Sequence, residues 1–486
     1  ILTAAFCRIL REDGFDAAPF KAQNMSLNSG VAPDGGEMGR AQILQAQAAG
    51  INPDCRMNPV LLKPSTDRGS QVIVLGRPAG FVEAKDFGSL RARLWERVTG
   101  AYASLSAEHG VMVLEGAGSP GEINLKKNDI VNMGLAELVD APVLLVGDID
   151  RGGVFAQLYG TIALLEPQEQ QRIKGTIVNK FRGDRAILQP GIDILEKICG
   201  VPVAGVIPYT HVDIDDEDSL SPRLHTGDGR KDIDIAVVKL PRISNFTDVS
   251  PLERFESVSV RYIERPDQLH QPDMILLPGT KSTIADLRWL RQSGLEAAIC
   301  QQAARGCIVF GICGGYQMLG TSVRDPLGVE AAGVTEIKGM GLLPMDTVFQ
   351  GEKVQQQTSG VFGEIPGALH SLSGMGYTGY EIHMGISRPE GDCEPFCRIR
   401  DEITGKERTD GIFAGKVCGT YVHGIFDHGS IAGKIVRHLA ERKGLVLGED
   451  GVDYGLFKEQ QYDKLAATLR EYLDLDAVYK MMREYE

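Results

Sequence analysis

The chain has 486 residues, of which 43% are hydrophobic and 24% charged, and its formal net charge is −14. This length predicts more than one domain, and the acidic balance argues against a nucleic-acid-binding surface. The apolar runs fall short of the roughly 20 residues that span a bilayer. Nine cysteines without a regular framework are typical of a reducing compartment, so we predict a cytoplasmic protein with neither a membrane nor a nucleic-acid partner.

The chain begins with "ILTAAFCRIL", whose apolar residues fall on one helical face, although neither an initiator Met nor an N-cap residue precedes them. Four apolar runs with helix-like segments between them follow, at residues 111–116, 142–150, 175–181 and 201–208. This alternation predicts a parallel, doubly wound α/β sheet. The polar stretch after it, residues 213–232, is interpreted as a linker.

A second series of the same kind starts after the linker, with apolar runs at residues 233–241, 273–280 and 307–315. The end of the chain carries apolar residues at helical spacing. The predicted fold class is therefore α/β, with two doubly wound domains. We place the first domain at residues 1–225, the second at 233–445 and a helical tail at 446–486.

The stretch "CIVFGICGGYQMLG" contains the strongest catalytic signal. Cys313 lies between glycines where an apolar strand turns into a helix, which is the thiol version of a nucleophile elbow. The helix N-terminus favours the thiolate, and the N–H of Gly314 is placed to stabilise an oxyanion. A second donor is expected from Gly279 or Thr280 in "LPGT". The flanking glycines favour a nucleophile over an inert buried thiol.

A nucleophilic thiol needs a base, and His423 in "VCGTYVHGIFDH" follows a further predicted strand, although a structural role fits this histidine equally well. Together, "GICGGYQMLG" and "YVHGIFDH" resemble the glutaminase domain of class I glutamine amidotransferases. The resemblance implies that Cys313 attacks the side-chain amide of glutamine with His423 as its base. Many members have a Glu two residues after the His, where this chain has Ile425. A Cys–His dyad is therefore expected, with Glu381 as a candidate to orient the imidazole.

The stretch "VLEGAGSPGEINL" supports two interpretations. Gly116, Gly118 and Gly121 match the G-x-G-x-x-G dinucleotide fingerprint after a strand, but Pro120 and the polar residues beyond it delay the helix that should follow. Alternatively, Glu115 at the end of the strand is placed to hold Mg²⁺ beside the phosphates of ATP. We favour the second interpretation.

Two further positions agree with an ATP site. Asn179 in "TIVNKF" follows a later strand, where many P-loop proteins bind the base, and Lys21 in "PFKAQNMS" is expected near the phosphates. With Glu115, these features resemble the dethiobiotin synthetase-like ATPases. In that fold a loop ending in Gly-Lys-Ser or Gly-Lys-Thr runs into a helix, and "ILTAAFCRIL" resembles that helix. We therefore expect the chain as given to lack the N-terminal strand and the phosphate loop.

Longer motifs resemble the cobyric acid synthase family, in this order: "KAQNMSLNSG", "DGGEMGRAQ", "MNPVLLKP", "GSQVIVLGRP", "VLEGAGSPGEINL", "DIDRGGVFA", "KLPRISNFTD" and "GYEIHMG". The resemblance implies ATP- and glutamine-dependent amidation of carboxylates b, d, e and g of adenosylcobyrinic acid a,c-diamide, giving adenosylcobyric acid in cobalamin biosynthesis. The reaction would pass through acyl phosphates and use ammonia released at Cys313. The alternatives are the a,c-diamide synthase of the same pathway and a non-catalytic amidotransferase-like scaffold.

The resemblance also implies the partners and the remaining site residues. The partners are small molecules: the corrinoid, glutamine and ATP, with Mg²⁺. Asp34 or Glu37 in "DGGEMGR" is a candidate second carboxylate beside Glu115 at the metal, although helix capping also explains one of them. The candidate corrinoid-side residues are Asp129, Glu381 and His383. Helix capping explains Asp129 equally well.

Overall fold

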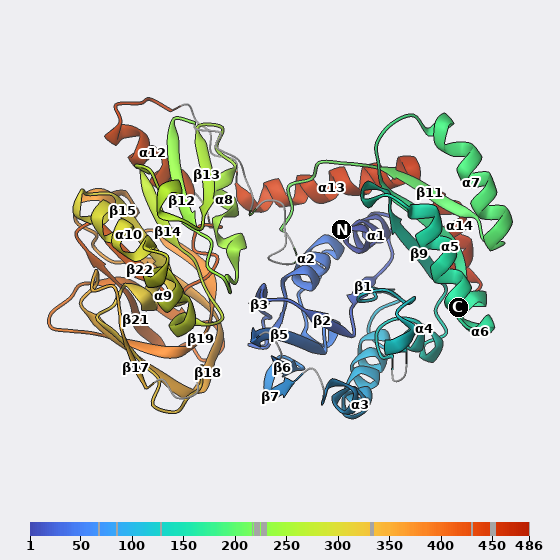
Figure 1. The fold of residues 1–486 in the computed structure, drawn as a ribbon, viewed down its shortest axis with the longest axis horizontal. Coiled ribbons are helices and arrows are strands. Elements are labelled where there is room, and N and C mark those ends of the chain that lie inside the picture. The colour runs from blue at the N-terminus through green and yellow to red at the C-terminus, as the bar shows by residue number, and fades with distance from the viewer. Residues whose placement is uncertain are drawn as a thin grey trace.

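The structure is a computed structural model that describes residues 1–66, 69–83, 86–126, 129–215, 217, 224, 231–330, 335–428, 431–447 and 453–485. Two α/β bodies lie side by side, and the long helix α13 (Tyr454–Tyr472) runs from one toward the other (Figure 1). The expected fold class is confirmed. Most of the expected linker at 213–232 falls outside the described residues.

The first body is built on short parallel strands. Strand β1 (Ala17–Phe20) pairs with β8 (Val111–Leu114), and a separate parallel sheet has the order β11-β10-β9, formed by Val203–Pro208, Ile173–Phe181 and Val143–Asp148. All four runs expected as strands here form β8 to β11. The helices are α1 (Leu2–Glu12), α2 (Arg40–Ala49), α3 (Phe87–Ser106), α4 (Met133–Leu138), α5 (Val154–Leu164), α6 (Pro167–Arg172) and α7 (Arg185–Cys199).

The segment between β1 and α3 forms two small sheets that the sequence did not predict. One has the order β2-β5-β6-β7, formed by Gln23–Met25, Val60–Thr66, Gly69–Val74 and Arg77–Glu83. The other is the hairpin of β3 (Ser29–Val31) and β4 (Glu37–Gly39). Strand β3 contacts β18 and β19 of the second body, so this insertion forms part of the interface between the two bodies.

The second body contains one large sheet. Its parallel half has the order β13-β12-β14-β15-β22, formed by Val258–Ile263, Ile233–Val238, Met274–Leu277, Ile308–Ile312 and Val417–Thr420. Strands β12, β14 and β15 are the three expected in this region. The rest of the sheet is mainly antiparallel: β16 (Ser322–Arg324), β17 (Glu336–Lys338), β18 (Met345–Phe362), β19 (Gly376–Pro389), β20 (Pro395–Asp401) and β21 (Glu407–Ala414).

Helices cover the parallel half of this sheet, and its strands are almost completely buried. These helices are α8 (Ser250–Glu253), α9 (Thr283–Gln292), α10 (Leu295–Ala304), α11 (Gly314–Leu319) and α12 (Ile431–Arg442). Strands that are buried on both faces read as continuous apolar runs, which is why the sequence revealed them.

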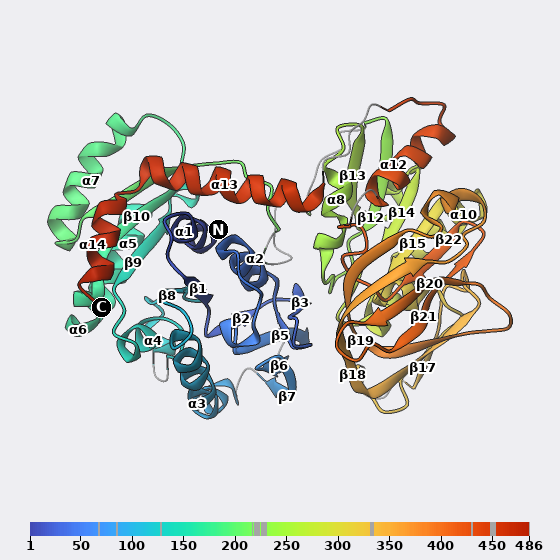
Figure 2. The same cartoon turned by 180° about the vertical axis from the view of Figure 1, so that it is seen from behind.

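The helical tail returns to the first body (Figure 2). Helix α13 packs on α1, where Arg8 bonds to Glu459 and Asp463, and Leu465 and Leu469 join the core cluster of Ala5 and Ile9. Helix α14 (Leu475–Arg483) follows after Leu473, which forms a bridge to β11. The tail therefore completes the hydrophobic core of a domain that begins more than 450 residues earlier in the chain.

Candidate active sites

Cys313 occupies a strained turn between β15 and α11. Its φ is 51° and its ψ is −107°, a conformation that costs free energy for a residue with a side chain. The turn also depends on its glycines, because a Cβ on Gly315 would lie 2.0 Å from the Leu277 carbonyl oxygen. The buried strand and the close helix thus hold the thiol at the carboxyl end of the parallel sheet, where ligands bind in open α/β folds.

His423 follows β22, the neighbour of β15, and is 1% exposed. Its Nδ1 lies 2.7 Å from an oxygen of Asp248, and the other Asp248 oxygen accepts the N–H of Gly424 at 2.8 Å. Burial opposes protonation of the imidazole, but Asp248 and Cys313 outweigh it and raise the pKa of His423 to about 10. The arrangement therefore favours an imidazolium beside the sulfur of Cys313.

Asp248 is the third member of this site and was not among the residues predicted from the sequence. It lies on the short 3-10 helix η6 (Phe246–Val249), after the carboxyl end of β12. Glu381, the candidate for orienting the imidazole, instead binds Arg408 and Gln356. The orienting role expected of Glu381 is therefore filled by Asp248. The available signal was the motif "KLPRISNFTD", whose last residue is Asp248.

The two glycines predicted for the oxyanion site lie next to the catalytic groups. A Cβ on Gly279 would lie 3.0 Å from the His423 ring, and a Cβ on Gly314 would lie 2.6 Å from the Thr280 side chain. The structure thus brings Gly279, Gly314, Cys313 and His423 together. Backbone N–H groups in such a place can stabilise the oxyanion of a tetrahedral intermediate.

His383 lies on the same strand as Glu381, within the amidotransferase body. Its Nδ1 lies 2.8 Å from the Gly385 oxygen, and its ring stacks on Tyr421 with centroids 3.8 Å apart. Both His383 and Glu381 are buried in the sheet formed by β18 to β21. Their predicted role toward the corrinoid stays a prediction.

The candidate ATP site centres on Lys21, directly after β1. The Lys21 ammonium donates to Glu115 and Glu217 at 2.8 Å each, and Gln45 donates to the second Glu115 oxygen. Burial opposes both charges, but their mutual attraction raises the pKa of Lys21 and lowers that of Glu115. The structure therefore brings the predicted phosphate and metal residues into direct contact.

Asn179 lies on another strand of this body. It is paired in register with Asp148, at the carboxyl ends of β10 and β9, and the next residue, Lys180, donates to Asp148 at 2.7 Å. The predicted contact of Asn179 with adenine stays a prediction.

Three acidic candidates have other contacts in the structure. Asp34 is exposed and accepts the N–H of Gly36 in a turn. Glu37 is completely buried and pairs with Lys63 and with Lys353 of the second body. Asp129 accepts three backbone N–H groups at the approach to α4, those of Val131, Asn132 and Gly134.

Metal binding by Glu115 is compatible with its surroundings. Among the described residues, no group of three or more His, Cys, Asp and Glu could hold a metal ion. Mg²⁺ bound with phosphates takes only one or two protein carboxylates, and the Glu115 carboxylate already faces a cationic partner. A single carboxylate here therefore fits a metal that arrives with its nucleotide.

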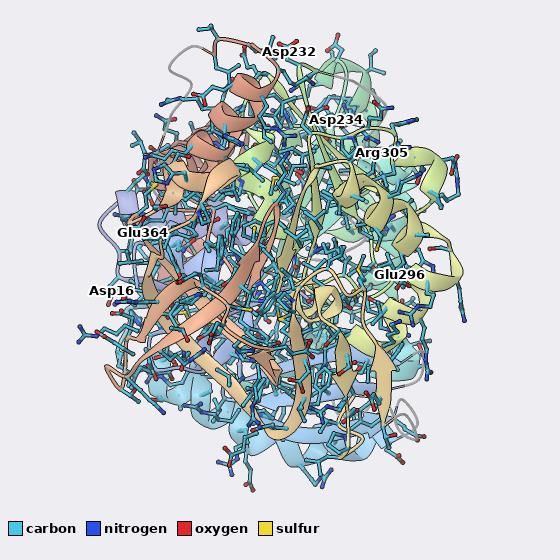
Figure 3. All side chains as sticks on the ribbon, turned by 90° about the vertical axis from the view of Figure 1, so that its left-hand side faces the viewer. Asp16, Asp232, Asp234, Glu296, Arg305 and Glu364 are labelled. Carbon is cyan, nitrogen blue, oxygen red and sulfur yellow. The ribbon has the colours of Figure 1, made fainter. Side chains whose placement is uncertain are left out.

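A cavity of about 680 Å³ lies at the amino ends of the parallel strands in the amidotransferase sheet, beside the start of β12. Figure 3 labels Asp234 and Arg305, which line it. Asp234 is already paired with Arg261 at 2.7 Å. Because Cys313 lies at the carboxyl end of β15, this cavity is not the glutaminase site.

These features define a glutamine amidotransferase joined to a nucleotide-binding body. The family models agree: residues 234–431 match the CobB/CobQ-like glutamine amidotransferase domain, and residues 1–221 match the CobQ/CobB/MinD/ParA nucleotide binding domain. A cobyric acid synthase of Ruminiclostridium cellulolyticum is 52% identical over the whole chain and 94% of its own length, and one of Lachnoclostridium phytofermentans is 53% identical over the whole chain and 96% of its length. The chain belongs to the cobyric acid synthase family.

A solved glutamine amidotransferase aligns with 43% of this chain and 99% of its own, at 17% identity and a TM-score of 0.31. Over the part of the chain that the structure describes, no helix has the length and apolar character needed to cross a membrane.

Proposed function

We propose that this chain amidates carboxylates b, d, e and g of adenosylcobyrinic acid a,c-diamide, with ATP as the activating substrate and glutamine as the nitrogen source. Membership of the cobyric acid synthase family supports the substrate. The observation that carries the chemistry is the buried contact of His423 with Asp248 beside Cys313. The nine unpaired cysteines favour a cytoplasmic setting.

Glutamine hydrolysis follows from this site. The Cys313 thiolate attacks the side-chain amide carbon, and backbone N–H groups at Gly314 and Gly279 stabilise the oxyanion. His423 donates its proton to the departing nitrogen, so ammonia leaves and a glutamyl thioester remains. Water, deprotonated by His423, then hydrolyses the thioester to glutamate and restores the thiol. Asp248 keeps the imidazole in the orientation that both proton transfers need.

Amidation takes place in the first body. A carboxylate resists ammonia because its leaving group would be oxide, whereas an acyl phosphate releases phosphate. Lys21 is placed to balance the charge of the phosphoryl groups, and Asn179 is placed to bind the base. Glu115 would hold Mg²⁺, which neutralises phosphate charge when it is bound. Ammonia then attacks the acyl carbon, and the phosphate leaves as the amide forms.

The test is to incubate the full chain with the a,c-diamide corrinoid, MgATP and glutamine and to follow the product by mass spectrometry. Four successive replacements of a hydroxyl by an amino group support the proposal. Amidation of the a and c carboxylates of cobyrinic acid instead would assign the rival a,c-diamide synthase activity. Absence of both amidation and glutaminase activity would leave the non-catalytic scaffold.

A further inference from the structure

A cavity of the amidotransferase body lies apart from both sites described above. It lies at the amino ends of the parallel strands, whereas Cys313 follows the carboxyl end of β15. Its volume of about 680 Å³ is typical of a pocket for a small molecule. The wall comes from four segments: the start of β12, the connection between β13 and β14, helix α10 and the residues after α12. A ligand here would therefore meet none of the catalytic groups.

The two carboxylates of the wall are already neutralised. Asp234 accepts two bonds from Arg261, at 2.7 and 2.8 Å. Asp267 accepts two from Arg265, at 3.0 Å each. An arginine fork of this kind binds both oxygens of a carboxylate and balances its charge. The cavity is therefore a poor site for a metal ion or an ammonium group.

The cationic side chains of the wall are balanced less completely. Lys443 donates to the Asp273 carboxylate at 2.9 Å and to the Asp232 carbonyl at 2.6 Å. Within the part of the chain that the structure describes, the Arg305 guanidinium and the Lys231 ammonium have neither a hydrogen-bonding nor an ionic partner. These two unbalanced charges make the cavity electropositive, in a chain whose formal net charge is −14.

Arg305 directly follows helix α10, and a cation at the end of a helix is favourable without any ligand. Two other cations already serve this turn, however. Lys416 and Arg442 both donate to the Gly306 carbonyl, at 3.1 and 3.0 Å. The helix end therefore does not need the Arg305 side chain, which instead lines the cavity (Figure 3).

Uncharged groups occupy the rest of the wall. Gln271 and Gln301 line it with amide groups that both donate and accept hydrogen bonds. Gln302 is fixed by a bond from its amide to the His270 carbonyl at 2.7 Å, which joins α10 to the segment before β14. Leu269 supplies a small apolar surface. The cavity therefore suits a ligand that carries hydrogen-bonding groups as well as negative charge.

We propose that this cavity binds a phosphate-bearing small molecule of about nucleotide size. The planar guanidinium of Arg305 matches two oxygens of a phosphoryl group, and Lys231 and Lys443 add point charges around it. A lone inorganic phosphate is too small for a cavity of this volume. Nucleoside diphosphates and inorganic polyphosphates both carry the required chemistry, and experiment distinguishes them. The site stands independently of the proposed amidation, since it shares no residue with either catalytic site.

The test is calorimetric titration of the full chain with ADP and, separately, with inorganic tripolyphosphate. We expect a binding component that Arg305→Ala and Lys231→Ala each weaken at least about tenfold, since each removes a charge-assisted bond to the ligand. Neither side chain has a partner within the described structure, so neither substitution leaves another charge of the protein unpaired. The component should also weaken as the ionic strength rises.

The matched control is Arg288→Ala. Arg288 is exposed on α9 of the same body but does not line the cavity, so its loss removes the same charge without affecting the ligand. Arg305→Lys keeps the charge but not the fork, and it should weaken binding less than Arg305→Ala does. The midpoint of thermal unfolding should be unchanged in all four variants, which shows that each is folded.

Each outcome has a separate meaning. A component that is sensitive to Arg305→Ala and Lys231→Ala supports the site: with ADP alone it assigns a nucleotide, and with tripolyphosphate alone or with both ligands it assigns the phosphoryl groups as the part recognised. Absence of such a component, or an equal loss of binding in Arg288→Ala, overturns the site. ADP bound in the first body gives a separate component that these substitutions leave unchanged, and its absence counts against the ATP site of the proposed function alone.

Discussion

The two candidate sites differ in how completely the protein assembles them. At the glutaminase site, Cys313, His423 and Asp248 follow strands of one continuous, buried sheet and meet without any ligand. At the ATP site, Lys21 is paired with Glu115 and Glu217. The first site is preorganised, whereas the second holds its charges in pairs that a nucleotide must rearrange.

The difference in charge has a direct consequence for ATP binding. The Lys21 side chain is 6% exposed and contacts two carboxylates, so an incoming phosphate must replace at least one of them. Glu217 is the more exposed partner, at 39% against 23% for Glu115. We therefore expect the Glu217 side chain to leave Lys21 and Glu115 to stay when a phosphate binds.

The largest expected effect is at the nucleophile. Cys313→Ala should lower glutamine-dependent amidation by about 10⁵-fold, because no other group forms the thioester. Amidation supported by ammonium chloride should continue, since the first body carries the activation step. Both rates can be followed by mass spectrometry of the corrinoid. If amidation fell equally with glutamine and with ammonium chloride, the ATP site would depend on Cys313, and the two sites would not be separate.

The next effect is at the orienting carboxylate. Asp248→Asn should lower kcat/KM for glutamine by about 10³-fold, since loss of an orienting Asp costs roughly two orders of magnitude less than loss of the nucleophile. Asp248 helps to raise the pKa of His423, so its removal lowers that pKa and shortens the pH range in which the imidazolium persists. The alkaline limb of the pH–rate profile should therefore move to lower pH. An unmoved limb would contradict the assigned contact.

The buried ion cluster between the bodies gives a stability effect. Glu37→Gln leaves Lys63 and Lys353 without their shared carboxylate and should cost about 3–5 kcal/mol, measured by thermal or chemical unfolding. The pKa of Glu37 is lowered: burial opposes its charge, but Lys353 and Lys63 outweigh burial. This contribution is therefore present above the pKa of the unfolded state and is lost as the pH falls through the folded-state pKa. Glu364→Gln, at an exposed position labelled in Figure 3, is the matched control and should change stability by less than about 0.5 kcal/mol.

Local patterns account for what the sequence predicted, and long-range contacts account for what it missed. A few adjacent residues specify the turn at Cys313, and β12, β14 and β15 are buried apolar runs. Strand β18 is mostly polar and only partly buried, so no apolar run marks it. Asp248 lies 175 residues from His423, a separation that no local spacing reveals.

Asp129 carries the smallest expected effect, and it separates two interpretations that the sequence left equal. Both of its carboxylate oxygens accept backbone N–H groups at the start of α4, so capping alone accounts for an Asp here. Asp129→Ala should therefore cost about 1 kcal/mol of stability, and Asp129→Ser should recover most of it, because a hydroxyl also caps. With the charge removed but the cap retained, KM for the corrinoid should stay unchanged in the Ser variant. A tenfold rise in that KM would instead assign Asp129 to the substrate and extend the ligand-dependent site beyond Lys21 and Glu115.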